Sequence, residues 1–351
     1  MDRTSELRRG GELQSRLCKE NGSPTYSAII DALVENILSS HIAVEILRAD
    51  TRDVDGSALY LRFLGAVNRM AVADPSCPLR RFFPSLGGQI DVGNVAEVFF
   101  DVVAANPDMI AAGLAADIQT NEVGRAAPLS AALNHLALTA GREVNLLEIG
   151  ASAGLNLWLD RYGVDAGQTR WGPPDSPVQL TGHFIAGSPP SGPFVVTDRK
   201  GCDLNPLDLA DPAASNLLRS FIWPEHVRRL NRLNAAIAAA PPITVTAQDA
   251  CGWLGSNLRE LPSAVVTVVF HSILWPYLSA AERVDLDEIM TEAGRRADRD
   301  HQLAWISLEP NEAYDTIQLT CRTWPGDRSE LLAETNPHGE AVRWLADPAK
   351  R

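Results

Sequence analysis

A loop of small residues between two apolar segments is the stretch of this chain best suited to chemistry. The apolar run Val144–Ile149 contains one acidic residue, Glu148, and leads into Gly150-Ala151-Ser152-Ala153-Gly154. The segment after the loop, Leu155–Leu159, has a helical pattern. A strand, a tight turn and a helix together let a ligand approach the backbone, and the start of a helix offers free N–H groups. The pattern therefore predicts a ligand-binding loop made of Glu148, Gly150, Ala151, Ser152 and Gly154.

Glycine spacing separates two cofactor sites that use such a loop. Dinucleotide-binding folds need glycine at the first, third and sixth loop positions. This chain has Gly150, Ser152 and Leu155 there, so that fingerprint fails twice. The loop of class I S-adenosylmethionine (SAM) methyltransferases has an acidic residue, a glycine two positions later and a second glycine four positions after the first. Glu148, Gly150 and Gly154 fit that spacing, with Ser152 at a position where glycine is commoner.

The same loop also matches the nucleophile elbow of serine hydrolases, G-x-S-x-G. A triad in the order Ser152, Asp249 and His271 can be written from the sequence. A hydrolase elbow normally follows a middle strand, however, whereas this loop follows the first expected strand. A tight turn that binds no ligand is a further interpretation.

Length, charge and cysteine usage limit the classes of protein. The 351 residues are enough for a large core and about two domains. The net charge of −13 argues against binding to nucleic acid or to anionic membranes. The five cysteines are scattered without a C-x-x-C pair, so we expect no disulfide framework, no metal site and a cytoplasmic location. The start is polar and no apolar run approaches about 20 residues, which predicts neither a signal peptide nor a membrane span.

The first third of the chain, residues 1–118, has helical spacing and almost no alternating strand pattern. We expect an all-helical cap domain that recognises the substrate. A polar segment, Gln119–Arg125, then precedes an expected helix over 126–139. The polar residues either cap that helix or form part of a lid over the ligand. In the second case the contacting residues are Asn121, Glu122 and Arg125.

Residues 119–351 alternate between expected strands and helices, which is typical of an α/β domain. The expected strands are Val144–Ile149, Phe194–Val196, Ile243–Ala247, Ala264–His271, Leu303–Leu308, Ile317–Arg322 and Glu340–Trp344. We expect the last two to form an antiparallel pair. The predicted fold is a Rossmann-like, mostly parallel sheet of seven strands in the order 3-2-1-4-5-7-6, as in class I methyltransferases. Residues 162–193 are rich in Gly and Pro, which indicates an inserted hairpin or long loop.

Polar residues follow the expected parallel strands, at the edge of the sheet where α/β folds bind ligands. Asp203 follows the second strand and either binds ribose hydroxyls or forms an Asx-turn. Asp249 and Ala250 follow the third, and Asp249 either accepts from an adenine amino group or caps a helix. His271 ends the most apolar strand and is either a catalytic base or a structural histidine. The residues expected to contact the substrate just after it are Trp275 and Tyr277.

Several motifs, spread over most of the chain, resemble an uncharacterised bacterial domain-of-unknown-function family. They are Gln119-Thr120-Asn121-Glu122-Val123-Gly124-Arg125, Gly150–Leu157, Gly201-Cys202-Asp203-Leu204-Asn205-Pro206, Trp223-Pro224 and the strand end Val268–His271. That family looks like a class I SAM-dependent methyltransferase family. The resemblance implies that Glu148–Gly154 wraps the methionine and ribose part of SAM, that Asp203 binds the ribose, and that Asp249 with Ala250 faces the adenine.

The function implied by this resemblance is SAM-dependent methyl transfer to a small-molecule acceptor, which the helical first third would recognise. A base is needed only if the acceptor carries a proton, and His271 and Glu122 are the candidates. A serine hydrolase that uses Ser152, and a binding protein that keeps the SAM fold without turnover, are the alternatives. The sequence predicts no oligomeric state.

Overall fold

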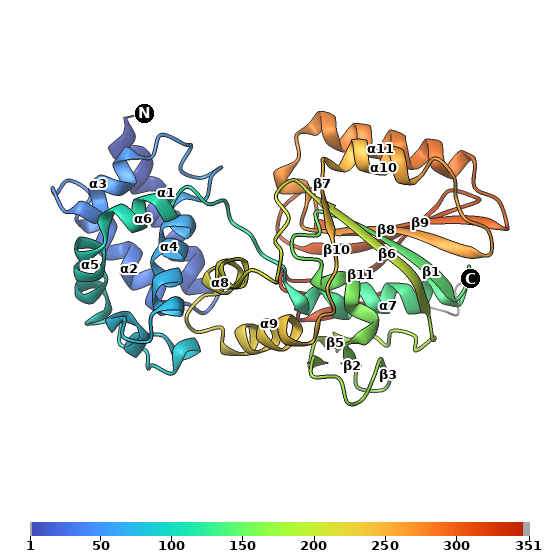
Figure 1. The fold of residues 1–351 in the computed structure, drawn as a ribbon, viewed down its shortest axis with the longest axis horizontal. Coiled ribbons are helices and arrows are strands. Elements are labelled where there is room, and N and C mark those ends of the chain that lie inside the picture. The colour runs from blue at the N-terminus through green and yellow to red at the C-terminus, as the bar shows by residue number, and fades with distance from the viewer. Residues whose placement is uncertain (1, 347–351) are drawn as a thin grey trace. The chain divides into compact units, whose positions relative to one another are not determined.

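The computed structural model describes residues 2–346, which divide into two compact units (Figure 1). The first unit is Met1–Thr120 together with Asp211–Asn231, and the second is Asn121–Ala210 together with Arg232–Arg351. Residue 1 and residues 347–351, the end of the expected second domain, lie outside the described residues. Among residues 2–346, none of the helices combines the length and the apolar character needed to cross a membrane.

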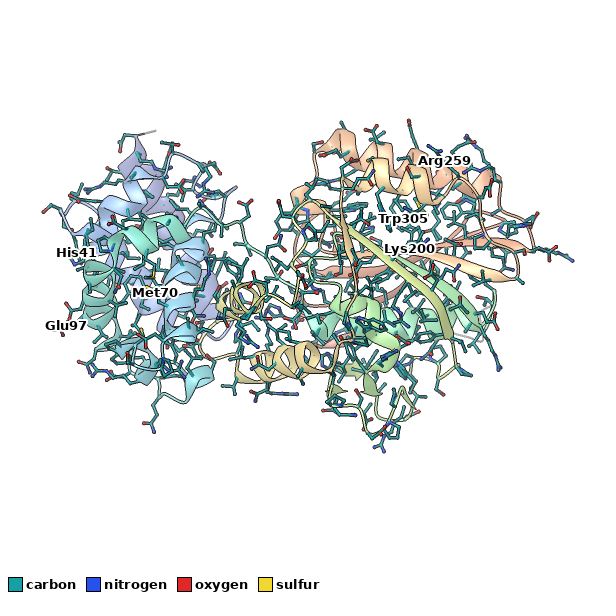
Figure 2. All side chains as sticks on the ribbon, viewed as in Figure 1. His41, Met70, Glu97, Lys200, Arg259 and Trp305 are labelled. Atoms are coloured by element: carbon teal, nitrogen blue, oxygen red, sulfur yellow. The ribbon has the colours of Figure 1, made fainter. Side chains whose placement is uncertain are left out.

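The first unit is built from helices, as its sequence pattern predicts. Between residues 2 and 120 the structure contains no strand. The helices are α1 (Arg3–Glu20), α2 (Pro24–Glu35), α3 (Ile42–Ala49), α4 (Leu59–Ala73), η1 (Pro78–Phe82), η2 (Pro84–Leu86), α5 (Val95–Ala105), α6 (Pro107–Gly113) and, from the later segment, α8 (Pro212–Ser220). The apolar faces of the helices before residue 120 form one core, against which Met70 packs, whereas Glu97 projects from α5 into solvent (Figure 2).

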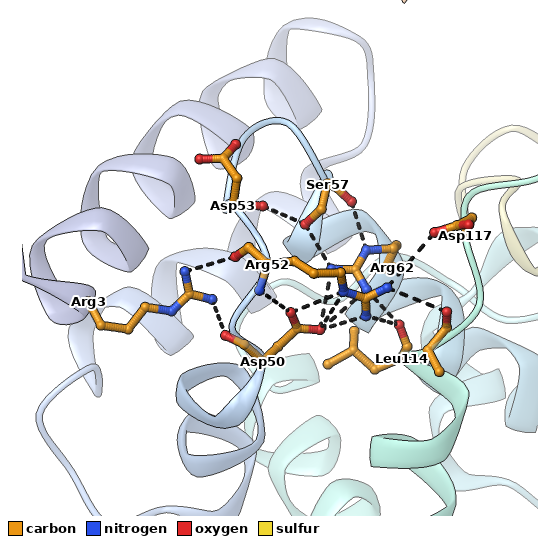
Figure 3. Close-up of polar contacts among 9 residues, drawn as sticks. Arg3, Asp50, Arg52, Asp53, Ser57, Arg62, Leu114 and Asp117 are labelled. Carbon is orange, nitrogen blue, oxygen red and sulfur yellow. Dashed lines mark hydrogen bonds and ion pairs between the residues drawn. The ribbon is translucent and has the colours of Figure 1, made fainter. Parts of the chain in front are cut away.

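A buried arginine closes the loop between α3 and α4. Arg62 is 1% exposed, and its guanidinium donates to the carbonyls of Ser57 (2.7 Å) and Leu114 (2.6 Å). It also pairs with Asp50 at 3.3 Å, and Arg52 contacts the same carboxylate at 2.6 Å (Figure 3). A buried charge is tolerated only when it is paired and hydrogen-bonded in this way. The network therefore fixes the loop and stabilises the unit without implying a ligand.

The segment 211–231 is integral to the helical unit. Asn68 of α4 donates to the carbonyls of Ser220 (2.9 Å) and Ile222 (3.2 Å). Glu225 accepts the hydroxyl of Ser23 and the backbone N–H of Thr25, at 2.5 and 2.8 Å. These contacts satisfy the start of α2, whose first N–H groups have no partner inside the helix.

A mixed, largely parallel sheet of nine strands forms the second unit. The strands are β1 (Glu143–Ile149), β5 (Phe184–Ala186), β6 (Val195–Asp203), β7 (Val245–Ala247), β8 (Val265–Ser272), β9 (His301–Pro310), β10 (Ile317–Trp324), β11 (Arg328–Thr335) and β12 (Val342–Trp344). Their order is β5-β12-β11-β10-β9-β8-β1-β6-β7. Strands β7, β6, β1, β8 and β9 are parallel neighbours, and β10 and β11 continue the sheet antiparallel. The chain is therefore an α/β protein with a helical N-terminal region.

The predicted strand order is wrong at the end of the chain. Strand β10 pairs with both β9 and β11, so the order continues 5-6-7 and the expected exchange of the last two strands is absent from the described residues. The expected pairing of 317–322 with 340–344 is also wrong, because β11 lies between them. Strand β11 was missed because Arg328–Thr335 has neither alternation nor many β-branched residues. A short turn places it beside β10, since strands joined by short turns pair as neighbours.

Helices cover both faces of this sheet. The helix α7 (Ala126–Ala137) lies on one face, and α10 (Ala250–Asn257) and α11 (Ala280–Arg295) lie on the other (Figure 1). The helix α9 (Val227–Ala239) spans the division of the chain between the two units. Strand β8 is buried along nearly its whole length between β1 and β9, as its continuous apolar run predicts.

The Gly- and Pro-rich insertion forms a small sheet of its own. It contains β2 (Gly163–Asp165), β3 (Arg170–Trp171) and β4 (Gln179–Thr181), in the order β3-β2-β4. The next strand, β5, leaves this small sheet and pairs with β12 at the edge of the large one. The insertion is therefore tied to the last strand of the described chain.

Candidate functional site

The glycine loop crosses the carboxyl end of the sheet from β1 toward β6. Gly150, Ser152 and Gly154 have φ values of +70°, +52° and +73°, a region that glycine adopts readily and serine rarely. Ala151 N–H donates to the carbonyl of Cys202 in β6 at 3.0 Å. The loop is buried except at Gly150, which is exposed. Gly150 is therefore the loop residue that can meet a ligand.

The segment after the loop is a 3-10 helix, η4 (Leu155–Arg161), and not the α-helix that its leucine pattern predicts. Its backbone departs from helical geometry at Trp158, whose ring stacks under the guanidinium of Arg199 at 4.0 Å. The guanidinium of Arg199 also donates a hydrogen bond to the carbonyl of Leu157. In an α-helix that carbonyl would accept from a backbone N–H four residues later. The first N–H, that of Leu155, donates to Asn121 Oδ1 at 2.8 Å. The α-helix start expected after the loop is therefore replaced by a 3-10 segment whose first N–H is already bound by Asn121.

Asp203, the expected ribose-binding residue, supports the loop. Its Oδ2 accepts the backbone N–H of Ser152 and its Oδ1 accepts the backbone N–H of Asn205, both at 2.9 Å. The second contact is the Asx-turn that the sequence allowed. Each carboxylate oxygen can accept a second hydrogen bond, so both remain able to bind a hydroxyl group.

Glu148 is a buried acid of the site whose pKa is raised. It is 2% exposed, and its Oε2 has no hydrogen-bond partner within residues 2–346. Burial raises the pKa of this carboxyl well above its ordinary value, the negative charge of Asp203 raises the pKa further, and the positive charge of Arg125 opposes both. A buried, unmet carboxyl at the end of a central strand is a signal of a functional site.

Asp249 and Ala250 begin α10 after β7. Asp249 is the N-cap and accepts the backbone N–H of Gly252 at 2.7 Å, and Ala250 is the first residue of the helix. Capping was one of the two roles that the sequence allowed, and the structure shows it.

Three side chains of the polar segment before α7 bind other parts of the second unit, to which they themselves belong. Asn121 caps η4 as described, and Arg125 donates to the carbonyls of Ser272 (3.1 Å) and Pro337 (2.9 Å). The buried carboxylate of Glu122 accepts Gly124 N–H at 3.1 Å and pairs with Arg232 at 3.3 Å. These contacts connect the glycine loop, the end of β8 and the turn before β12. They are what a structural role requires, and they give the expected base role of Glu122 no support.

His271 and Glu309 meet at the ends of β8 and β9. His271 Nδ1 lies 2.7 Å from Glu309 Oε1, and both side chains are buried. Glu309 also accepts the backbone N–H groups of Leu274 (2.7 Å) and Trp275 (3.1 Å). The sequence reasoning missed Glu309 because it ended the strand at Leu308. The usable signal was an acidic residue at the carboxyl end of the fifth parallel strand.

Two expected substrate residues follow His271 in the chain. Trp275 is half-buried and its ring centroid lies 4.4 Å from that of His271, whereas Tyr277 is 66% exposed. Trp305 of β9 packs against both His271 and Trp275, in the layer between the sheet and α10–α11 (Figure 2). The hydrolase alternative needs a hydrogen bond from Ser152 to His271. His271 Nε2 has no partner in the described part of the chain, so that bond is not formed.

The position of β1 makes the loop end of the sheet a topological switch point. From β1 the chain proceeds to β6 and β7 on one side, and then to β8 and β9 on the other. Open α/β sheets bind ligands in the crevice at such a point, outside the carboxyl ends of the strands. Glu148, Asp203, His271 and Glu309 all lie at this edge.

Comparison with known proteins shows one family. The model of a bacterial family described as "Uncharacterized protein conserved in bacteria (DUF2332)" matches residues 10–344. No curated protein and no solved structure matches the chain. The match covers nearly the whole sequence, so the protein belongs to the family DUF2332.

Proposed function

We propose that the protein binds SAM at the carboxyl ends of β1, β6 and β8 and transfers the methyl group to a small-molecule acceptor. The observation that supports this best is the parallel half of the sheet. In its order, β7-β6-β1-β8-β9, a glycine loop follows β1 at the switch point, and the acid Asp203 ends the neighbouring strand β6. That is the arrangement in which an α/β sheet holds a nucleoside.

The residues present fit SAM in charge and hydrogen bonding. The ligand carries an ammonium and a sulfonium group, and a positive charge beside Glu148 would oppose the raised pKa of its unmet carboxyl and favour the ionised form that complements it. Asp203 has acceptor capacity left for ribose hydroxyls after its two backbone contacts. When bound, SAM supplies a methyl carbon already activated by sulfonium. The chain then needs chiefly to orient the acceptor and to exclude water.

Two features depart from the expected fold: the arrangement of the last strands, which lie away from this edge, and the 3-10 segment, which lies at it. Strands β10 to β12 continue the far side of the sheet and leave β6, β1 and β8 as neighbours. The 3-10 segment replaces an α-helix start, so Gly150, the exposed residue of the loop, and Asp203 must provide the polar contacts instead.

Titration calorimetry with SAM, and with its demethylated product, tests the proposal. Asp203→Ala should weaken binding by about 1–3 kcal/mol, because polar partners are left unmet. Asp198→Ala is the matched control, since Asp198 lies in the same strand and its exposed side chain pairs only with Lys200 and its own neighbour's backbone among the described contacts. Absence of binding heat for both ligands, with a folded protein, would contradict SAM binding.

One observation favours the hydrolase alternative. Ser152 combines the G-x-S-x-G spacing with φ +52°, the kind of backbone strain found at nucleophile elbows. Labelling of Ser152 by a fluorophosphonate probe would replace the SAM proposal with this one.

A further inference from the structure

The imidazole of His271 is held by a carboxylate on one side only. Glu309 receives three donors: the ring Nδ1 of His271 and the backbone N–H groups of Leu274 and Trp275. An ionised carboxylate only accepts hydrogen bonds, so Nδ1 must be the donor in this contact. In the neutral ring the remaining lone pair then lies on Nε2.

That lone pair is buried and unmet. His271 is fully buried, and Nε2 has no hydrogen-bond partner among the residues that the structure describes. A buried polar atom in this state is unfavourable, and native proteins keep few of them. The indole Nε1 of Trp305 is equally unmet within residues 2–346, and its ring centroid lies 5.9 Å from that of His271. His271 Nε2 can accept a hydrogen bond and Trp305 Nε1 can donate one. Together they suit a ligand group that carries a proton and a lone pair, such as a hydroxyl.

The cover over this cluster is a strained segment. Ile273 has φ +52°, which β-branched residues rarely adopt. The next residue, Leu274, reaches to within 2.9 Å of the position that a Cβ would take at Gly150. The ring of half-buried Trp275 then lies tilted against that of His271, with the centroids 4.4 Å apart. Backbone strain of this kind collects at active sites, ligand clamps and switch regions.

We propose that His271 Nε2 takes the proton of the acceptor during methyl transfer, and that Glu309 is the positioning residue that keeps the proton of the neutral ring on Nδ1. The proposal rests on the proposed function and names its substrate class: a small molecule whose reacting oxygen or nitrogen carries a proton. That atom forms a bond to the methyl carbon, and the carbon–sulfur bond breaks with its electron pair left on sulfur. The proton passes to Nε2, which leaves His271 as imidazolium.

Histidine-selective ¹⁵N NMR of the full chain tests the tautomer, and His271→Asn identifies the signal. At alkaline pH the wild type should carry the proton of His271 on Nδ1. Glu309→Gln should populate the Nε2–H form, because an amide can donate as well as accept. Glu340→Gln removes a carboxylate that pairs with Arg232 in the same unit, and should leave the signal unchanged. An Nε2–H form in the wild type, or an unchanged tautomer in Glu309→Gln, would overturn the assignment.

Diethyl pyrocarbonate, which acylates unprotonated imidazole nitrogen, tests access to Nε2. Mass mapping should find His271 modified in the folded protein, and Trp275→Ala should raise the rate several-fold by removing the ring that lies against it. His183, whose two ring nitrogens contact Gly339 and Arg232, is the internal control and should react more slowly. If His271 stays unmodified in both proteins while the unfolded chain reacts, it is a structural residue and the proposal fails. Neither measurement contains SAM, so its outcome is distinct from a failure of SAM binding.

Discussion

The ring of Phe221 occupies the space that a side chain at Gly65 would need. Phe221 Cε1 lies 2.6 Å from the position that a Cβ would take there. Gly65 belongs to α4, and Phe221 follows α8, so this contact packs the segment 211–231 against the helices of its own unit. The bonds from Asn68 to the carbonyls on either side of Phe221 hold the ring in place.

Gly65→Ala should therefore destabilise the protein by about 1–3 kcal/mol, the usual cost of overpacking a core. Gly255→Ala is the matched control, because a Cβ at that position of α10 meets no described atom within 4 Å. There the gain in helix propensity should stabilise the protein by up to about 1 kcal/mol. Urea denaturation measures both variants. Equal stabilisation by the two alanines would show that the Phe221 contact is not tight.

Glu148 should make stability fall as pH rises. The folded carboxyl keeps its proton above the ordinary pKa of 4.5, whereas the unfolded one loses it. The folded state then binds more protons, so the free energy of unfolding decreases with pH above that value. Each unit of pKa elevation corresponds to about 1.4 kcal/mol. Glu148→Gln should flatten this slope. Its gain in the free energy of unfolding over the wild type should be largest at mildly alkaline pH.

Asp165→Asn provides a control of opposite sign for that slope. The backbone N–H of Gly167 and the charge of Arg170 hold the pKa of Asp165 below its ordinary value. The stability that Asp165 contributes is present above that pKa and is lost on acidification, so Asp165→Asn should lower stability at neutral pH and flatten the stability–pH curve only on its acid side. A Glu148→Gln curve parallel to the wild type would mean that Glu148 is ionised in the folded protein.

Ser152→Gly should leave SAM affinity and stability within about 1 kcal/mol of the wild type. Glycine adopts the positive φ of this position without strain and keeps the N–H that Asp203 accepts. Thermal unfolding with and without SAM measures the effect. A serine hydrolase would instead lose on the order of 10⁴-fold in activity. Fluorophosphonate labelling that disappears in Ser152→Ala would decide for the hydrolase.

Glu122→Gln should act on stability and not on proton transfer. Its carboxylate pairs with buried Arg232, and hydrogen bonds to charged groups contribute about 1.5–3 kcal/mol. Glu340→Gln should cost less, since Glu340 binds the same guanidinium from a side chain that is 35% exposed. Chemical denaturation ranks the two. A Glu122→Gln protein as stable as the wild type would reopen a catalytic role for this residue.

The parallel half of the fold could be predicted because its signals are local. Strand β8 is one apolar run, and the S-x-x-E spacing of Ser279 and Glu282 is typical of the capping box that the two residues form at the start of α11. The glycine loop was recognisable because small residues at fixed spacing follow an apolar run.

The sequence failed to predict the 3-10 segment, β11 and Glu309 because each depends on contacts between residues that are far apart in the sequence. The leucines after the loop have helical spacing, yet Arg199 takes the carbonyl of Leu157 and holds the Trp158 ring, which leaves a 3-10 segment. Strand β11 has a weak pattern of its own and forms by pairing with β10. Glu309 lies 38 residues after His271, so no local motif joins the two.

The discontinuous first unit has a consequence for synthesis on the ribosome. Residues up to Thr120 emerge well before Asp211–Asn231, which complete the same unit. The 90 residues of Asn121–Ala210 must be translated in between, which takes roughly 5–20 s at the usual rate of about 5–20 residues per second. During that delay the slot beside Gly65 lacks its aromatic ring. A nascent chain arrested within this interval should therefore be sensitive to protease in α4, and one released after residue 231 should be protected.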